Sequence, residues 1–396
     1  MRWCINIPVM TSLPSRRIAL VLGGGGLKGI AHLGVLRALT EREVVPALVA
    51  GTSIGSLIGT AFAGGMSLNE MEKRALELRR SDLFRLDRIG MLRQRQNAVS
   101  IYLEEPLREL CLSIVPPVRL SDFEIPVLVN TVDLQQGAQV VWGLPGLRDV
   151  AAPDAVYASC ALPGFFPPGY VGRRVCADGG VIDNLPVAVA AREMDAVIAV
   201  DVGSSDIPRR HDIVAAGFAS IYMRAASTMM HALQLAPLVN WSAPPMLLVR
   251  PKISHVPWFS FSHAEELIHA GYEAAIEALD AYDACLEEPA GVFPRREIRV
   301  EVDPGKCIGC TLCVALAPGT MAMGEDGKAF ARTPVVEWSP ADGDFVNHCP
   351  TLAITAEPLL PDEMPALEAS QADVPRLTET LGEALGPEGD QEVEPV

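Results

Sequence analysis

The sequence predicts an α/β protein with a mostly parallel sheet covered by helices on both faces, followed by a small α+β domain. Short apolar strands alternate with helical stretches through residues 17–286, which is typical of parallel sheets buried between helices. A stretch with closely spaced cysteines then follows a linker at residues 287–291. The change in composition at this linker predicts a second, smaller domain.

The alternation can be followed element by element. Residues 17–22 predict a buried strand, residues 23–26 a glycine turn, and residues 27–39 a helix with apolar periodicity. Residues 46–51 and 53–63 predict the next strand and helix. Further strands are expected at 125–134, 139–143, 195–202 and 246–250, and a long closing helix at 264–286. These elements predict one large domain.

We divide the chain into five segments. They are an N-terminal tail (1–16), the core of the large domain (17–205), a helical and apolar remainder of that domain (206–290), a small module (296–358) and an acidic tail (359–396). The acidic tail has too few apolar residues to pack, so we expect it to be disordered.

Charge and cysteine content limit the class of protein. Much of the net charge of −17 falls in the acidic tail, and the acidic balance argues against a nucleic-acid partner and against strong attraction to anionic lipid. Residues 1–16 lack an apolar region followed by a cleavage site. Nine cysteines without such a signal favour a reducing compartment. We therefore expect a cytoplasmic protein.

A glycine loop, GGGGLKG at residues 23–29, joins the first strand to the first helix. Gly24, Gly26 and Gly29 fit G-x-G-x-x-G, the dinucleotide fingerprint. Glycine-rich backbone at a helix N-terminus can equally bind the oxyanion of a tetrahedral intermediate. The loop alone therefore leaves a nucleotide site and an oxyanion site open.

The second strand distinguishes these two uses of the loop. A dinucleotide site would place an acidic residue near the end of that strand. This strand instead runs into Gly51-Thr52-Ser53-Ile54-Gly55. G-x-S-x-G between a strand and a helix is the context of a nucleophile elbow. The sequence therefore favours Ser53 as a nucleophile, and no nucleotide is expected.

Asp178 is the candidate base for Ser53, because no histidine stands out in a motif. It precedes Gly179 and Gly180, which predicts an exposed turn from which the carboxylate can reach another loop. Capping of that turn is the alternative role. An unperturbed aspartate has a pKa of about 3.9 and is a weak base. Oxyanion donors would then have to supply much of the rate.

Four segments together resemble the patatin-like phospholipase family. They are GGGGLKG, GTSIGS, ASCALPGFFPP (158–168) and DGGVIDNLP (178–186). They occur in the family's order over about residues 17–205, and we extend the domain to about residue 285. The resemblance implies a three-layer α/β/α fold.

The resemblance also implies site residues. It makes Ser53 the nucleophile and Asp178 the general base of a dyad without histidine. It makes the backbone N–H groups of the glycine loop the oxyanion donors, and Asp183 and Asn184 structural residues. The oxyanion donors would be Gly24, Gly25 and Gly26, and the remaining motif glycines are Gly29, Gly51, Gly55, Gly179 and Gly180.

What the resemblance implies for function is hydrolysis of lipid esters, phospholipid or lysophospholipid, with transient contact at the inner membrane surface. Residues 225–249 carry no charge and could form a lipid-facing cover over the site. An ordinary buried helix and loop is the alternative. Pro237, Pro244 and Pro245 exclude a membrane-spanning helix here.

Cys307, Cys310 and Cys313 form C-x₂-C-x₂-C, and Cys349 precedes a proline. In a two-cluster ferredoxin the run continues with a cysteine before proline, whereas here Ala317 stands in that place. The stretch resembles single-cluster bacterial-type ferredoxins, which implies one [4Fe–4S] cluster on the four cysteines. A structural zinc site is the alternative, but it usually has two separated cysteine pairs.

Nothing in the sequence decides what the cluster does. It could regulate the hydrolase, dock a redox partner protein, or serve structure alone, and regulation is favoured because ester hydrolysis consumes no electrons. The second hypothesis for the whole chain is an electron-transfer protein whose glycine loop binds a nucleotide and whose serine is idle.

Overall fold

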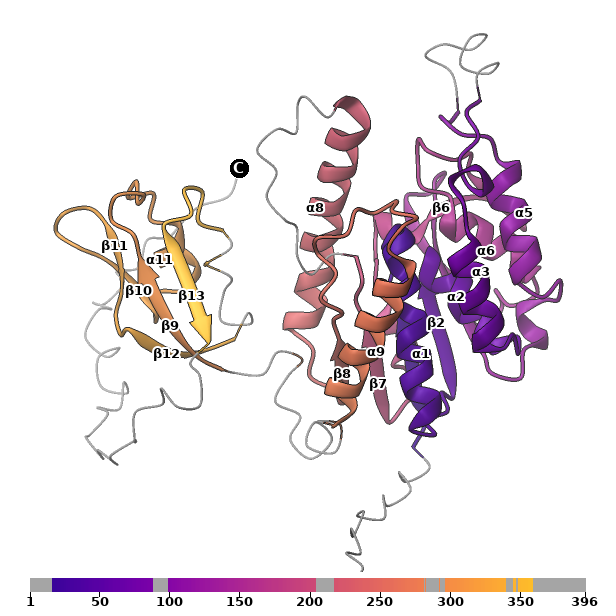
Figure 1. Ribbon diagram of the computed structural model, residues 1–396, viewed down its shortest axis with the longest axis horizontal. Helices are drawn as coiled ribbons and strands as arrows, with labels where there is room; N and C mark the ends of the chain where they lie inside the picture. The colour runs from indigo at the N-terminus through magenta and orange to yellow at the C-terminus, as the bar shows by residue number, and fades with distance from the viewer. Residues whose placement is uncertain are drawn as a thin grey trace, which may run out of the picture. The chain divides into compact units, whose positions relative to one another are not determined.

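The computed structural model describes residues 16–87, 99–203, 217–280, 296–339 and 348–358, together with residues 282, 292, 345 and 346. The chain divides into two compact units, and the second begins at Arg296. Each unit is described by itself (Figure 1). The predicted acidic tail and residues 1–15 of the predicted N-terminal tail lie outside the described residues.

An eight-stranded sheet forms the centre of the larger unit. Its order is β5-β6-β3-β2-β1-β7-β8, with β4 paired to β3. The strands are β1 (Ile18–Leu22), β2 (Leu48–Thr52), β3 (Val127–Asp133), β4 (Ala138–Trp142), β5 (Gly169–Val171), β6 (Arg174–Asp178), β7 (Ala196–Val200) and β8 (Met246–Val249). The pairs from β3 through β2, β1 and β7 to β8 are parallel, whereas β4, β5 and β6 are antiparallel additions.

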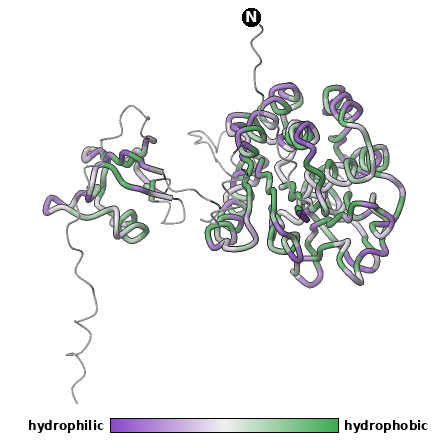
Figure 2. Tube along the Cα trace, turned by 90° about the horizontal axis from the view of Figure 1, so that it is seen from below, coloured by the Kyte–Doolittle hydropathy of each residue, from purple (hydrophilic) through white to green (hydrophobic). Residues whose placement is uncertain are grey.

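Helices cover both faces of this sheet, which confirms the predicted fold class. Alternate residues of β1 enter different cores, Leu20 and Leu22 on one face and Ala19 and Val21 on the other, as the period of two in a strand requires. The helices are η1 (Gly26–Ile30), α1 (Ala31–Glu41), α2 (Ile54–Ala63), α3 (Leu68–Glu77), η2 (Arg80–Asp82), α5 (Glu105–Ile114), η4 (Leu120–Asp122), α6 (Ala152–Cys160), η5 (Gly179–Val181), α7 (Val187–Ala190), α8 (Gly217–Val239) and α9 (Ala264–Asp280). Figure 2 shows apolar chain inside this unit and polar turns around it.

Helices α1 and α9 approach each other closely through glycine. A Cβ added to Gly34 of α1 would lie 1.8 Å from the carbonyl oxygen of Ile268. A Cβ added to Gly271 of α9 would lie 1.9 Å from the carbonyl oxygen of Ala31. This contact fixes the closing helix against the helix that follows the glycine loop.

Each strand predicted from the sequence overlaps a strand of the structure, whereas β5 and β6 were not predicted. Helix α8 occupies part of the region expected to be helical and apolar. Within the parts of the chain that the structure describes, no helix combines the length and the apolar character needed to span a bilayer.

The smaller unit has a three-stranded antiparallel sheet of order β12-β9-β13 and a hairpin of β10 and β11. Its elements are β9 (Arg296–Val302), α11 (Leu312–Leu316), β10 (Met321–Met323), β11 (Ala329–Ala331), β12 (Val335–Trp338) and β13 (Ile354–Pro358). Ile298, Met321, Phe345 and Ile354 are buried in a separate hydrophobic core. The unit is a small α+β domain with its own core.

Candidate active site

Ser53 lies on a tight turn between β2 and α2. It is the N-cap residue of α2 and has φ 53° and ψ −127°, a strained conformation for a residue with a side chain. A Cβ added to Gly51 would lie 2.5 Å from the backbone of Gly55, and one added to Gly55 would lie 2.1 Å from the carbonyl oxygen of Leu22. The two glycines therefore permit the turn that lifts Ser53 to the end of the sheet.

Strand register brings Ser53 and Asp178 to the same level of the sheet. Thr52 pairs with Asn130 across the parallel β2–β3 ladder, and Thr131 pairs with Asp178 across the antiparallel β3–β6 ladder. Ser53 and Asp178 thus flank Thr131, about two strand spacings or roughly 10 Å apart in backbone. Side chains rising from these two positions can meet above β3.

A buried serine supports the Ser53 turn from below. The Ser53 N–H donates to Ser159 Oγ at 2.8 Å, and the Ser159 hydroxyl donates to the Asn130 carbonyl oxygen at 2.7 Å. Ser159 lies on α6 and is fully buried. Because one hydroxyl joins the Ser53 turn to β3, Ser53 is held in register with the strand beside it.

Asp178 is buried, so the expectation of an exposed turn is wrong. Its side chain is 5% exposed, and Oδ1 accepts a hydrogen bond from Gly180 N at 2.8 Å. Burial raises its pKa to about 6, although hydrogen bonds from Gly180 and from the Ser53 side chain act in the opposite direction. Asp178 is therefore a stronger base than the unperturbed carboxylate that the sequence suggested.

The loop that follows Asp178 is tied to the sheet and to the glycine loop. Asn130 Nδ2 donates to the Asp183 carbonyl at 2.6 Å, and Gln139 Nε2 donates to Asp183 Oδ2 at 3.1 Å. Asn184 Nδ2 donates to the Gly24 carbonyl at 3.0 Å, while Gly24 N donates to the Asn184 carbonyl at 3.2 Å. Asp183 and Asn184 thus fix the relative positions of the two loops.

The glycine loop offers fewer free amides than the sequence suggested. The N–H of Gly24 is directed to Asn184, which leaves Gly25 and Gly26 of the three predicted oxyanion donors. Of the three, Gly26 lines the pocket that holds Ser53, and its φ of 57° orients the start of η1. His32 is fully buried behind the loop, with Nε2 2.8 Å from the Gly23 carbonyl oxygen. His32 therefore supports the loop and does not reach Ser53.

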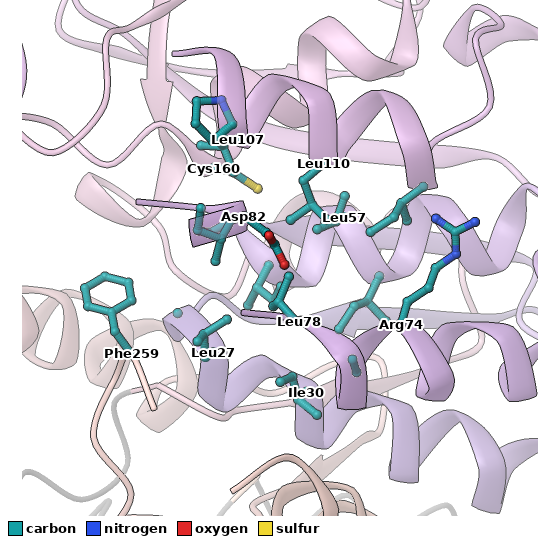
Figure 3. A pocket seen from close by; sticks show the side chains of 18 of the residues that line it. Leu27, Ile30, Leu57, Arg74, Leu78, Asp82, Leu107, Leu110, Cys160 and Phe259 are labelled. Atoms are coloured by element: carbon teal, nitrogen blue, oxygen red, sulfur yellow. The ribbon is translucent and has the colours of Figure 1, made fainter. Parts of the chain in front are cut away.

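Ser53 and Asp178 both line an apolar pocket with a volume of about 610 Å³. Figure 3 shows leucine side chains along it, with Phe259 toward one end and Arg74 at the other. Apolar side chains of α1, α2, α3 and α5, together with the residue that follows α3, line part of its wall: Leu33, Leu57, Ile58, Met71, Leu78, Leu107 and Leu110. This volume lies within the range of about 300–1,000 Å³ typical of ligand pockets.

Several residues that line the pocket or hold Ser53 in place could not be identified from the sequence. Ser159 and Cys160 lie within residues 158–168, one of the four segments that resemble the patatin-like family. The sequence indicated no functional role for either residue. Asn130 lies within a predicted strand with no motif around it. The helices α3 and α5 gave no functional signal, because ordinary amphipathic helices have the same residue pattern. The residues that line a pocket can be identified only when it is known which helices pack together.

The four predicted cluster ligands lie together in the smaller unit. Cys307, Cys310, Cys313 and Cys349 line one small cavity. Three of them come from the loop and short helix after β9, and the fourth precedes β13. Among the described residues, no group of three or more His, Cys, Asp or Glu side chains is arranged to hold a single metal ion.

Backbone N–H groups already point at these sulfur atoms. Ala329 N donates to Cys307 Sγ at 3.4 Å, and Ala353 N donates to Cys349 Sγ at 3.3 Å. Hydrogen bonds to the sulfurs are one of the means by which proteins stabilise iron–sulfur clusters. Four cysteines thus line one cavity, and two of their sulfur atoms accept backbone hydrogen bonds.

Two family models match the chain. Residues 20–191 match the patatin-like phospholipase family, and residues 300–356 match the 4Fe-4S single cluster domain. The matches confirm both resemblances and their order in the chain.

Curated relatives match part of the chain. An uncharacterized NTE family protein of Mycobacterium bovis is 36% identical over 193 residues, which are 48% of this chain and 51% of that protein. Patatin-like phospholipase domain-containing protein 6 of Homo sapiens is 36% identical over 198 residues, 49% of this chain and 14% of that protein. Lysophospholipase NTE1 of Saccharomyces cerevisiae is 29% identical over 283 residues, 66% of this chain and 16% of that protein. The chain thus spans about half the length of the mycobacterial relative and a smaller share of the others.

Among solved structures, VipD from Legionella pneumophila aligns with a TM-score of 0.37 and 14% identity, covering 68% of each chain.

Proposed function

Since residues 20–191 belong to the patatin-like phospholipase family and residues 300–356 to the single-cluster 4Fe-4S family, we propose that this chain is a serine acyl hydrolase that cleaves lipid esters. The observation that carries the proposal is the position of Ser53 and Asp178 on one wall of a long apolar pocket. A nucleophile beside a base and an acyl-sized apolar cavity suits an ester of a fatty acid.

In the proposed reaction, Ser53 Oγ attacks the ester carbonyl carbon while Asp178 accepts the hydroxyl proton. The tetrahedral intermediate places negative charge on the former carbonyl oxygen, where the amides of Gly25 and Gly26 can donate hydrogen bonds. Asp178 then returns the proton to the leaving alcohol. Water activated by Asp178 hydrolyses the acyl-enzyme and releases the fatty acid.

The pKa of about 6 for Asp178 suits this role. At pH 7 the carboxylate is mostly ionised and can accept the Ser53 proton. Its pKa is also closer to neutrality than that of an ordinary aspartate, so transfer of the proton is less unfavourable.

The substrate is proposed to be a phospholipid or lysophospholipid, with one acyl chain in the pocket and the polar portion outside. Aliphatic side chains of the pocket lining suit an acyl chain. Charged side chains such as Arg74, Asp82 and Arg85 occur along its rim, where a head group would remain solvated.

In the smaller unit, Cys307, Cys310, Cys313 and Cys349 would hold one [4Fe–4S] cluster. When bound, such a cluster supplies a one-electron change in charge. The amides of Ala329 and Ala353 donate hydrogen bonds to two of these sulfur atoms. We propose that this unit regulates the hydrolase, and docking of a redox partner protein is the second role.

Covalent labelling and lipid hydrolysis test the proposal together. A fluorophosphonate probe should label the parent chain and leave Ser53→Ala unlabelled. The parent chain should release fatty acid from mixed phospholipid and lysophospholipid vesicles, and Ser53→Ala should release none. Absence of labelling together with tight nucleotide binding would support the electron-transfer hypothesis instead.

The regulatory role is tested separately with anaerobically purified protein. Ser53-dependent release should differ between oxidised and dithionite-reduced protein if the cluster regulates hydrolysis. Equal rates in the oxidised, reduced and cluster-free forms would contradict regulation and leave hydrolysis intact.

A further inference from the structure

Helix α8 is apolar on the side that faces solvent. Ile221, Met229 and Leu233 are 44%, 60% and 50% exposed. They are separated by multiples of four residues, so they lie on one side of the helix. Exposed aliphatic residues are unremarkable singly, but a row along one helix marks an interaction surface.

The opposite side of α8 packs onto the candidate active site. Ser227, Met230, Gln234 and Leu238 are buried, with the i, i+3, i+7, i+11 spacing of a core-facing stripe. The terminal methyl of Met230 lies 2.7 Å from the position of a Cβ added to Gly180. The helix is therefore packed directly against the loop that carries Asp178.

Two hydrogen bonds connect α8 to the loops of the site. Asn184 Nδ2 donates to Gln234 Oε1 at 3.2 Å, and the same Nδ2 donates to the Gly24 carbonyl at 3.0 Å. The Tyr222 hydroxyl donates to the Pro163 carbonyl at 2.9 Å. These contacts make α8 part of the frame around Ser53 and Asp178, with its outer side open.

A further exposed apolar residue lies in the turn that follows Asp178. Val181 is 45% exposed and lies in η5, which packs against α8. It is three residues from Asp178. The exposed apolar side chains of α8, namely Ile221, Met229 and Leu233, are called the α8 face below.

Charge restricts what the α8 face can contact. Helix α8 contains one residue among Asp, Glu, Lys and Arg, the half-buried Arg224, and the chain as a whole carries a net charge of −17, much of it in the acidic tail. A surface of this kind gains free energy from apolar burial and receives no attraction from anionic head groups. The occupant it fits is a lipid surface without net charge.

We propose that the α8 face docks the enzyme on a lipid bilayer of zwitterionic head groups, with Met229 and Leu233 inserted among the lipids. The proposal rests on the proposed function, since a lipid substrate would be presented in such a surface. It deepens that function by assigning the element that meets the lipid. It also assigns different roles to the apolar residues of α8. Met230 and Leu238 are buried in the protein, whereas Met229 and Leu233 are exposed and would contact lipid.

Vesicle binding tests the proposal without requiring catalysis. The full chain carrying Ser53→Ala is sedimented with vesicles of ether-linked phosphatidylcholine, which has no ester to cleave. Met229→Glu with Leu233→Glu should lower the partition coefficient at least about tenfold, because two charges replace two inserting apolar groups. Binding should change little with salt and should not increase when anionic lipid is added.

Val45→Glu is the matched control. Val45 is 73% exposed and precedes β2, at the end of the sheet opposite Ser53. Its substitution adds one exposed charge without altering the α8 face, so vesicle binding should remain at the parent level. Equal binding by the parent and the double variant would overturn the proposal. No vesicle binding by the parent would also overturn it, as would self-association that the double variant abolishes.

A soluble short-chain ester separates this proposal from the proposed function. In a chain that retains Ser53, the double variant Met229→Glu with Leu233→Glu should hydrolyse p-nitrophenyl butyrate at the parent rate. It should hydrolyse vesicle lipid more slowly than the parent does. A parent chain that binds vesicles through the α8 face but hydrolyses no ester would contradict the proposed function alone. Loss of butyrate hydrolysis in the double variant, with the parent active, would contradict the docking role.

Discussion

Replacing Asp178 by asparagine removes a charge from a buried site and keeps the size of the side chain. The pKa of Asp178 is raised from 3.8 to about 6 by burial. Between these values the folded state holds a proton that the unfolded chain has released. The free energy of unfolding therefore falls as pH rises through this window, and the ionised carboxylate costs stability above it.

The magnitude follows from the shift. About two pKa units at about 1.36 kcal/mol each give about 3 kcal/mol. Asp178→Asn should therefore raise the free energy of unfolding by up to about 3 kcal/mol at pH 7, with a smaller gain at pH 5 and none below pH 4. Hydrolysis should fall by about 10²–10⁴-fold, the usual contribution of a general base.

Urea unfolding at several pH values measures the effect, with hydrolysis of a short-chain ester measured on the same samples. Ser53→Ala is the control, because it removes activity and retains the buried carboxyl group. It should not reproduce the pH-dependent gain. A variant that is no more stable than the parent at pH 7, or whose difference from the parent is unchanged at pH 4, would refute the reasoning. Normal turnover by folded Asp178→Asn would refute the catalytic role.

Four further outcomes are expected. The value of kcat/KM should rise about tenfold per pH unit below pH 6 and level off above it, because Asp178 must be ionised to accept a proton; a flat profile from pH 5 to 8 would argue against that base. Leu110→Trp, in the pocket wall, should slow hydrolysis of long-chain esters at least about tenfold and spare short-chain ones, and an equal loss on both would indicate a folding defect. Gly34→Ala should destabilise the chain by about 1–3 kcal/mol or more, since the added Cβ would meet backbone of α9 at 1.8 Å; thermal unfolding measures this, and an unchanged Tm would contradict the close helix contact. Cys349→Ser should lower iron bound per chain and bleach the visible absorbance, whereas Cys160→Ser should leave both unchanged; equal iron in the two variants would remove Cys349 from the ligand set.

The local parts of the site could be predicted because their geometry is encoded within a few residues. A strand, a tight glycine turn and a helix N-terminus occupy five consecutive residues around Ser53, and each has its own residue preference. The cysteine spacing of the smaller unit is similarly local. Such features do not depend on which distant elements pack beside them.

The environment of Asp178 could not be predicted in the same way. Its burial depends on pairing between β3 and the short strand β6, and on α8 lying over the loop that follows. β6 begins after a turn and ends in glycines, so its five residues give little periodicity. The occupied amide of Gly24 likewise depends on Asn184, which is 160 residues away in the sequence.

The pocket shows the same limit on a larger scale. Its wall combines side chains from α1, α2, α3 and α5, and each helix taken alone is an ordinary amphipathic helix. Only their arrangement leaves a cavity that none of them fills. For residues 225–249 the sequence left a lipid-facing cover and an ordinary buried helix and loop as alternatives, and α8 has features of both because it buries one side and exposes the other.

The position of β1 in the middle of the sheet affects the order in which the nascent chain can fold. β1 lies between β2 and β7, and Ile18 pairs with Ala196, which is synthesised 178 residues later. At about 5–20 residues per second, translation of that interval takes about 9–36 s. Through this time one edge of an entirely apolar strand has no partner. The Gly23 amide also waits for the Val200 carbonyl, to which it donates at 3.0 Å. β1 and the start of the glycine loop therefore reach their final geometry only after β7 has been synthesised.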